Sequence, residues 1–120
     1  MEVSATIIGN VPSKSNQYKV IRINGHSSVA KSAAMKKYEE SFIWQAGALR
    51  DLNIDEPYEL YLDVYYPSKR TDLDNALKGV SDILQRIKCI KNDNNCCKIV
   101  ARKFIDKLNP RINITIKTLE

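Results

Sequence analysis

The residues best suited to chemistry lie in one short segment, residues 69–82. Asp72 and Asp74 stand two positions apart there, and Lys78 and Asp82 follow at intervals of four. Residues two apart in an extended or turn segment point the same way, so the first two carboxylates can converge. Two carboxylates this close repel each other when both are ionised. A divalent cation such as Mg²⁺, which prefers oxygen ligands, would remove that cost. The segment therefore offers a site for a hard metal ion with a lysine beside it.

A purely structural role explains the same residues. Aspartate is common at helix N-caps, and a lysine four positions later often forms an ion pair on a solvated helix face. Asn75 fits the first turn of such a helix. A second polar segment, residues 92–95, can bring Asp93 to the same end of the sheet as Asp72 if the intervening chain folds back, but it is also typical of a plain turn. Each segment alone leaves both interpretations open.

The surrounding pattern indicates an α+β domain that would hold these segments. Apolar residues recur at three- and four-residue steps from about residue 29 to 52 and again after Asp72, which is typical of helices. Residues 58–66 alternate between apolar and polar positions, which predicts a strand with one buried face. We expect the first 24 residues to form a strand pair. The predicted order is β-β-α-β-α-β-β, with one mixed or antiparallel sheet covered mainly on one face by two helices. The predicted strands are residues 3–8, 18–23, 58–66, 97–105 and 111–118.

Length and composition restrict the class of protein. The 120 residues predict one domain, residues 1–120, with 43% hydrophobic and 28% charged residues, as in ordinary globular proteins. No apolar run reaches the ~18–20 residues that span a bilayer, and the N-terminus lacks a leader pattern, so we expect no membrane and a cytoplasmic location. Three cysteines and one histidine make a zinc site improbable and favour reduced thiols. The net charge of +5 favours nucleic acid as the partner.

Taken together, the candidate residues resemble the RusA family of Holliday junction resolvases, small endonucleases of bacteria and their phages. The resemblance covers essentially the whole chain, including its length and element order, and its motif core lies in residues 69–95. Family members often carry two aspartates in the second segment, whereas here Asn92 precedes Asp93 and supplies no second carboxylate. The matching residues are Lys69-Arg70, Asp72-Leu73-Asp74-Asn75, Lys78, Asp82 and Asp93, with the loop Pro12-Ser13-Lys14-Ser15-Asn16 near the start.

The resemblance implies a homodimer, of a bacterium or prophage, that binds four-way DNA junctions. It would make paired symmetric nicks near the crossover, a reaction of DNA recombination and repair. It would use Mg²⁺, or alternatively Mn²⁺, and no small-molecule cofactor. The residue chemistry agrees, because a carboxylate-bound metal activates water and orients a phosphate while a lysine offsets transition-state charge. The implied catalytic residues are Asp72, Asp74, Lys78 and Asp93, of which the three aspartates would hold the metal.

Neighbouring residues would support this site. Asp82 is expected to hold Lys78 in position, although a plain surface ion pair explains Asp82 equally well. Asn75 is expected to position the metal ligands without binding the metal itself. Lys19 and Arg22 near the N-terminal loop either extend the basic surface or are ordinary solvated residues. Contacts to the DNA backbone, which carry no sequence information, would come from Lys69, Arg70 and Lys14.

Three other functions stay open at the level of the sequence. A non-catalytic basic module that binds branched or duplex DNA would keep its binding when Asp72 or Asp93 is changed. A metal-dependent nuclease for other branched or duplex DNA would use the same carboxylates, so only a comparison of substrates separates it from a junction resolvase. A dimeric structural protein with an acidic patch would leave Lys78 without a purpose.

Overall fold

The computed structural model describes residues 1–12 and 18–119. Within these residues the order of elements extends the predicted one by a strand near the N-terminus. The elements are β1 Glu2–Ile8, β2 Tyr18–Ile23, β3 His26–Lys31, α1 Ala33–Gln45, the 3-10 helix η2 Gly47–Leu49, β4 Tyr58–Tyr66, α2 Asn75–Arg86, the 3-10 helix η3 Asp93–Asn95, β5 Cys96–Ile105 and β6 Arg111–Thr118.

Four of the strands form one mixed sheet in the order β1-β6-β4-β5. β6 pairs antiparallel with both β1 and β4, whereas β4 and β5 run parallel. Parallel neighbours need a crossover connection, and α2 provides it. The helix therefore returns the chain from the end of β4 to the level at which β4 begins. This path determines where the residues before and after α2 lie.

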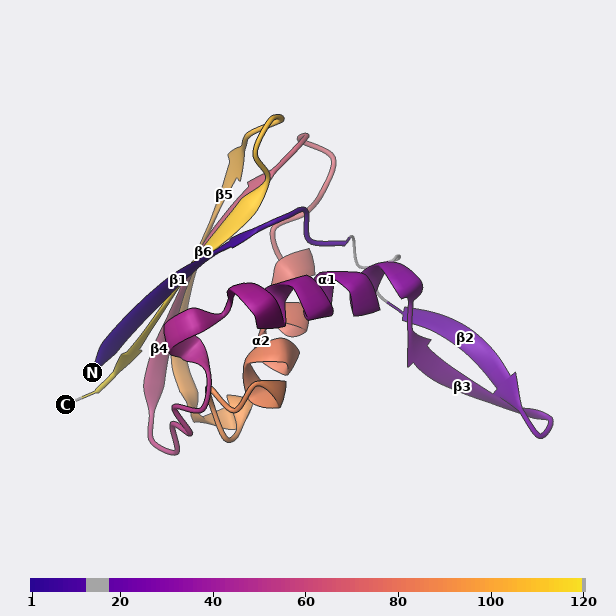
Figure 1. Cartoon of the computed structure of the whole chain (residues 1–120), viewed down its shortest axis with the longest axis horizontal. Helices are drawn as coiled ribbons and strands as arrows, with labels where there is room; N and C mark the ends of the chain where they lie inside the picture. The colour runs from indigo at the N-terminus through magenta and orange to yellow at the C-terminus, as the bar shows by residue number, and fades with distance from the viewer. Residues whose placement is uncertain (13–17, 120) are drawn as a thin grey trace.

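Both α-helices lie on the same face of the sheet, as predicted (Figure 1). The residues of β4 alternate between buried and half-buried along the whole strand. Met35 and Phe42 of α1 and Val80 and Leu84 of α2 are buried in the same core as the inward residues of β4. The α+β class and the one-sided helical layer are thus confirmed.

The N-terminal strands pair differently from the prediction. β1 pairs with β6 rather than with β2, and β2 forms a separate two-stranded hairpin with β3. Asn24 and Gly25 adopt φ values of 50° and 80°, the left-handed conformation that two-residue Asn-Gly hairpin turns require. The predicted pairing within the first 24 residues is therefore wrong, because this turn joins β2 to a third strand. That third strand occupies residues in which the pattern predicts the start of a helix.

The first helix is shorter than predicted at both ends. Ser32 caps α1 by accepting a hydrogen bond from the Met35 backbone N–H at 3.0 Å, so the helix begins directly after this serine. After Gln45 the chain passes into η2, where Gly47 adopts a φ of 53° that an α-helix does not permit. Leu49 remains buried, as its place in the apolar pattern predicts. Among the described residues, no helix combines the length and apolar character needed to cross a membrane.

Candidate active site

The loop between β4 and α2 presents Asp72 and Asp74 at one end of the sheet. Tyr66, the last residue of β4, donates a hydrogen bond from its hydroxyl to the Asp72 carbonyl at 3.2 Å. Asn75 donates to the same carbonyl from its backbone N–H at 3.2 Å and from its side-chain Nδ2 at 3.0 Å. Three donors therefore hold the Asp72 backbone while both aspartates stay exposed. Asn75 thus orders the loop without presenting a carboxylate of its own.

The buried phenol of Tyr66 contacts the loop that carries the two aspartates. Its side chain is completely buried, and burial, followed by the negative charges of Asp74 and Asp72, raises the pKa of Tyr66 to about 12. The phenol therefore remains a donor at neutral pH, and both aspartates belong to the loop that it contacts. Two exposed carboxylates two residues apart on one loop suit Mg²⁺, which commonly takes one or two carboxylates and keeps several waters.

Lys78 is exposed on α2, one helical turn beyond Asp74. In the described part of the chain, none of the ion pairs includes this lysine. Asp82, predicted either to fix Lys78 or to form a plain surface pair, accepts a hydrogen bond from the Tyr18 hydroxyl at 3.1 Å. A simple helix-surface pair would join the Lys78 ammonium to a carboxylate, and the described residues contain no such ion pair.

A second lysine at this end of the sheet, Lys103, was not among the residues predicted from the sequence. The Nζ atom of Lys103 lies 5.8 Å from the centre of the Tyr66 ring and donates to the Lys69 carbonyl at 3.0 Å. Lys103 pairs in register with the buried Val64, which places it on the helix-covered face of the sheet. The signal in the sequence was a charged residue on the face of β5 that otherwise carries small or apolar residues such as Ala101.

Asp93 lies at the opposite end of the sheet. It begins η3 directly before β5, and Cys96 pairs with Tyr58 at the start of β4. Burial, then the nearby Cys96 and Asp93, raise the pKa of the Tyr58 hydroxyl. Tyr58 and Tyr66 are the two ends of β4, which eight steps of strand rise separate by about 26 Å. No group of three or more Asp, Glu, His or Cys side chains in the described residues is arranged to hold a metal. Within one protomer the chain therefore does not bring Asp93 to the end of the sheet at which Asp72 lies, and the role that the family resemblance implies for Asp93 stays a prediction.

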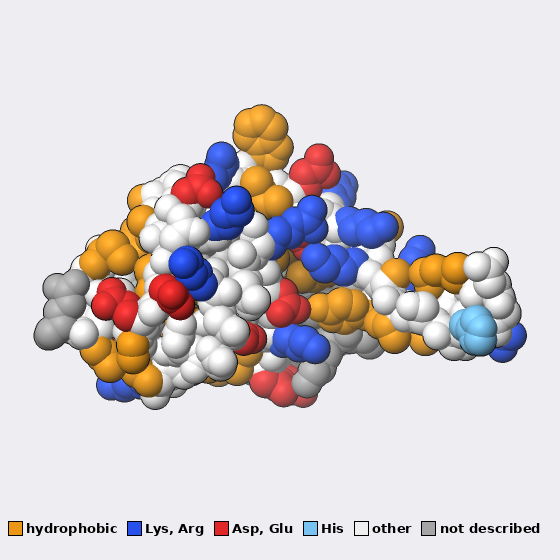
Figure 2. Space-filling model, turned by 90° about the horizontal axis from the view of Figure 1, so that it is seen from below, with side chains coloured by type: hydrophobic (Ala, Val, Ile, Leu, Met, Phe, Trp, Pro, Cys, Tyr) orange, Lys and Arg blue, Asp and Glu red, His pale blue; other side chains and the backbone are white. Residues whose placement is uncertain are grey.

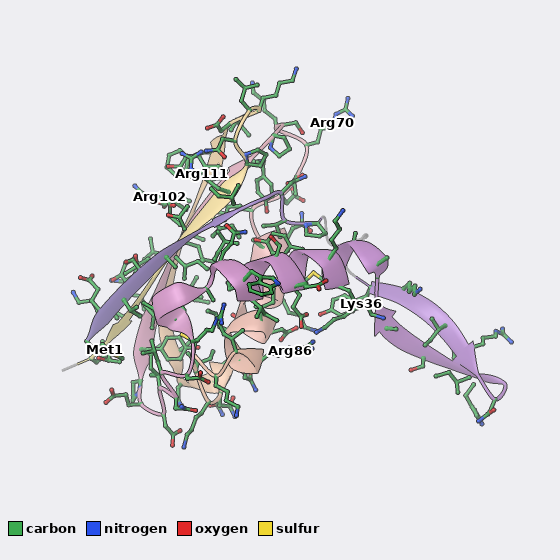
Figure 3. All side chains as sticks on the ribbon, viewed as in Figure 1. Met1, Lys36, Arg70, Arg86, Arg102 and Arg111 are labelled. Carbon is green, nitrogen blue, oxygen red and sulfur yellow. The ribbon has the colours of Figure 1, made fainter. Side chains whose placement is uncertain are left out.

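Basic side chains flank the aspartates on the same loop. Lys69 and Arg70 are both exposed. Figure 3 shows Arg70 extending away from the loop into solvent. Both side chains are therefore accessible on the loop that carries the two aspartates. The third basic residue predicted for DNA binding, Lys14, lies outside the described residues.

The fold and this site together define a class: a small α+β protein that exposes two aspartates and several lysines at one end of a mixed sheet, residue types that can hold a divalent cation beside a phosphate. Comparison with known proteins identifies the family. The sequence model of the family described as Endodeoxyribonuclease RusA matches residues 9–117. A relative named Crossover junction endodeoxyribonuclease RusA, from Aquifex aeolicus (strain VF5), is 32% identical over 111 residues, which cover 89% of this chain and 84% of the relative. The chain belongs to the RusA family of endodeoxyribonucleases.

Proposed function

We propose that this protein is a metal-dependent endonuclease that resolves four-way DNA junctions by paired symmetric nicks. The observation that carries the proposal is the exposed pair Asp72 and Asp74, held over a buried tyrosine with Lys78 one helical turn away. The name of the relative from Aquifex aeolicus, a crossover junction endodeoxyribonuclease, supports the junction as the substrate. A protein that acts on cellular DNA would work in the cytoplasm of a bacterium, as a protein of the bacterium or of its prophage.

The carboxylates of Asp72 and Asp74 would hold Mg²⁺ or, with the same oxygen donors, Mn²⁺. A bound divalent cation would supply Lewis-acid stabilisation of the scissile phosphate and lower the pKa of a coordinated water. Lys78 would contact the phosphate and offset the negative charge that develops as the phosphorus–oxygen bond breaks. Lys103 would add positive charge at the edge of the site. Its hydrogen bond to the Lys69 carbonyl would hold the loop between β4 and α2, which carries Lys69 and Arg70, in place.

Asp93 enters this proposal through a homodimer. Within one protomer it lies at the far end of β4, so it reaches a site only if a second copy runs in the opposite direction beside the first. A two-fold axis produces this arrangement twice, because each contact between two copies is then repeated in reverse. Asp93 of the partner subunit would complete the carboxylate set of Asp72 and Asp74. Two equivalent sites would act on opposed DNA strands.

The decisive test is cleavage of a labelled four-way junction beside a linear duplex of the same sequence. Wild type and Asp72→Asn are each assayed with Mg²⁺ or with EDTA. Paired nicks in the junction alone, dependent on metal and lost in the variant, are expected. Equal cutting of both substrates would instead identify a general nuclease. Binding without any cutting, unaffected by metal, would identify a non-catalytic DNA-binding module and overturn the proposal.

A further inference from the structure

The hairpin of β2 and β3, residues 18–31, is an arm that projects from the body of the protein (Figure 1). Its two strands form their own sheet and do not join the four-stranded one. Val20 and Val29 face each other across this hairpin with 73% and 67% of their surfaces exposed, and Ile23 is 55% exposed. Figure 2 shows the hydrophobic side chains along the arm. An isolated two-stranded hairpin is marginally stable in water, and exposed apolar side chains of this kind mark interaction surfaces.

The charge of the arm indicates the kind of partner. Residues 18–31 contain Lys19, Arg22 and Lys31 but no aspartate or glutamate. Lys31 pairs with Glu39, whereas Lys19 and Arg22 are exposed. A second copy of the arm would bring like charges together in a self-complementary contact, which is unfavourable. A polyanion is attracted by the same charges, and two-stranded ribbons fit DNA grooves, where apolar side chains contact base edges.

The arm is fixed to the helix that carries the candidate active site. At the base of β2, the Tyr18 hydroxyl donates to the Asp82 carboxylate on α2 at 3.1 Å. Asp82 lies one helical turn beyond Lys78. Tyr18 and Lys19 also line one cavity with Thr71, the residue that precedes Asp72. A continuous surface thus joins the aspartate loop to the arm.

We propose that this arm binds the DNA duplex that leads away from the active site. Lys19 and Arg22 contact backbone phosphates, and Val20 and Val29 contact the sugars and base edges of a groove. This inference rests on the proposed function, because it takes DNA as the substrate. It adds a second contact region, separate from the basic residues beside the aspartates.

The test compares the wild type with a shortened arm, in which Lys19 is joined to Ala30 by an Asn-Gly turn. Tyr18 and Lys31 remain, so the contacts at the base of the arm are kept. Binding to a labelled four-way junction is measured in EDTA across a range of salt concentrations, which removes cleavage from the readout. We expect the shortened arm to weaken binding about tenfold or more. Lys19→Ala and Arg22→Ala should each reduce the slope of log affinity against log salt by about one.

Lys117→Ala is the matched control, because this exposed lysine pairs in register with Glu2 near the N-terminus, far from the arm. It should leave junction affinity unchanged. Unchanged affinity and salt slope in both arm point variants would overturn the inference, even if the shortened protein fails to fold. A photoreactive p-benzoylphenylalanine at position 20 provides a direct readout. Cross-linking to DNA is expected, and cross-linking to a second copy alone would assign the arm to dimerisation instead.

The arm and the proposed function can fail separately. A wild type that cuts junctions but binds them equally well without the arm would overturn only the inference about the arm. Binding that depends on the arm, in a protein that never cuts, would leave the arm as a DNA-binding element and overturn the nuclease proposal.

Discussion

Two inactive variants of this protein should restore each other's activity when their subunits are exchanged. Asp72→Asn removes a carboxylate from the loop after β4, and Asp93→Asn removes one from the far end of that strand, about 26 Å away by strand rise. If each site takes Asp93 from the partner subunit, a mixed dimer contains one site with both defects and one site with none. If each site were built within one protomer, every subunit in the mixture would remain defective.

The expected yield follows from random assortment. Equal amounts of the two variants give about half mixed dimers, each with one intact site, and therefore about one quarter of the wild-type sites. A mixed dimer cuts one strand only. The product should therefore be a junction with a single nick, visible on a denaturing gel, rather than a pair of separated duplexes on a native gel.

The assay refolds the two variants together from urea and adds labelled junction with Mg²⁺. Each variant refolded alone is the negative control, and wild type refolded with Lys117→Ala verifies that the procedure preserves activity. A mixture as inactive as its parents, beside an active control, would refute a site shared between subunits. Full activity of Asp93→Asn by itself would refute any need for this carboxylate.

Lys103→Met should lower the single-turnover cleavage rate about tenfold, with partial recovery in Lys103→Arg, because the lysine adds positive charge beside the aspartates; an unaltered rate would remove it from the site. Glu39 is only 3% exposed and accepts hydrogen bonds from both Lys31 and Arg86. Glu39→Gln should therefore lower the free energy of unfolding in urea by about 2 kcal/mol, and an unchanged midpoint would contradict this estimate. The pKa of Tyr66 is raised to about 12 in the folded state, whereas an exposed tyrosine in the unfolded chain titrates near 10. The neutral phenol therefore contributes fully to the stability of the fold below about pH 10, and this contribution is lost as the pH rises toward 12. Tyr66→Phe should reduce the fall in the free energy of unfolding between about pH 10 and 12. The same fall in wild type and variant would argue against a raised pKa for Tyr66.

Much of the sheet and its helical layer could be predicted because the pattern is strong where one face is buried. Residues 58–66 alternate cleanly, and the apolar face of α2 is well marked. The arm could not be predicted in the same way. Residues 26–31 have no buried face, so no alternation of polarity indicates a strand. The partner of β1 was also hidden, because residues 2–8 pair with residues 111–118 at the other end of the chain.

The same reason separates the site residues that the sequence could predict from those that it could not. Asp72, Asp74 and Lys78 are close in sequence, so local geometry brings them together. The position of Asp93 depends instead on the direction in which β5 runs relative to β4, which local spacing does not determine. Lys103 reaches the site only through the pairing of those two strands.

The attachment of the arm has a mechanical consequence. β2 is tied to α2 through Tyr18 and Asp82, and β3 is tied to the same helix through Lys31, Glu39 and Arg86. A hairpin anchored through both of its strands is restricted in more directions than one anchored through a single strand. A ligand that reorients the arm therefore also acts on the contacts at Asp82 and Arg86, which belong to the helix that carries Lys78.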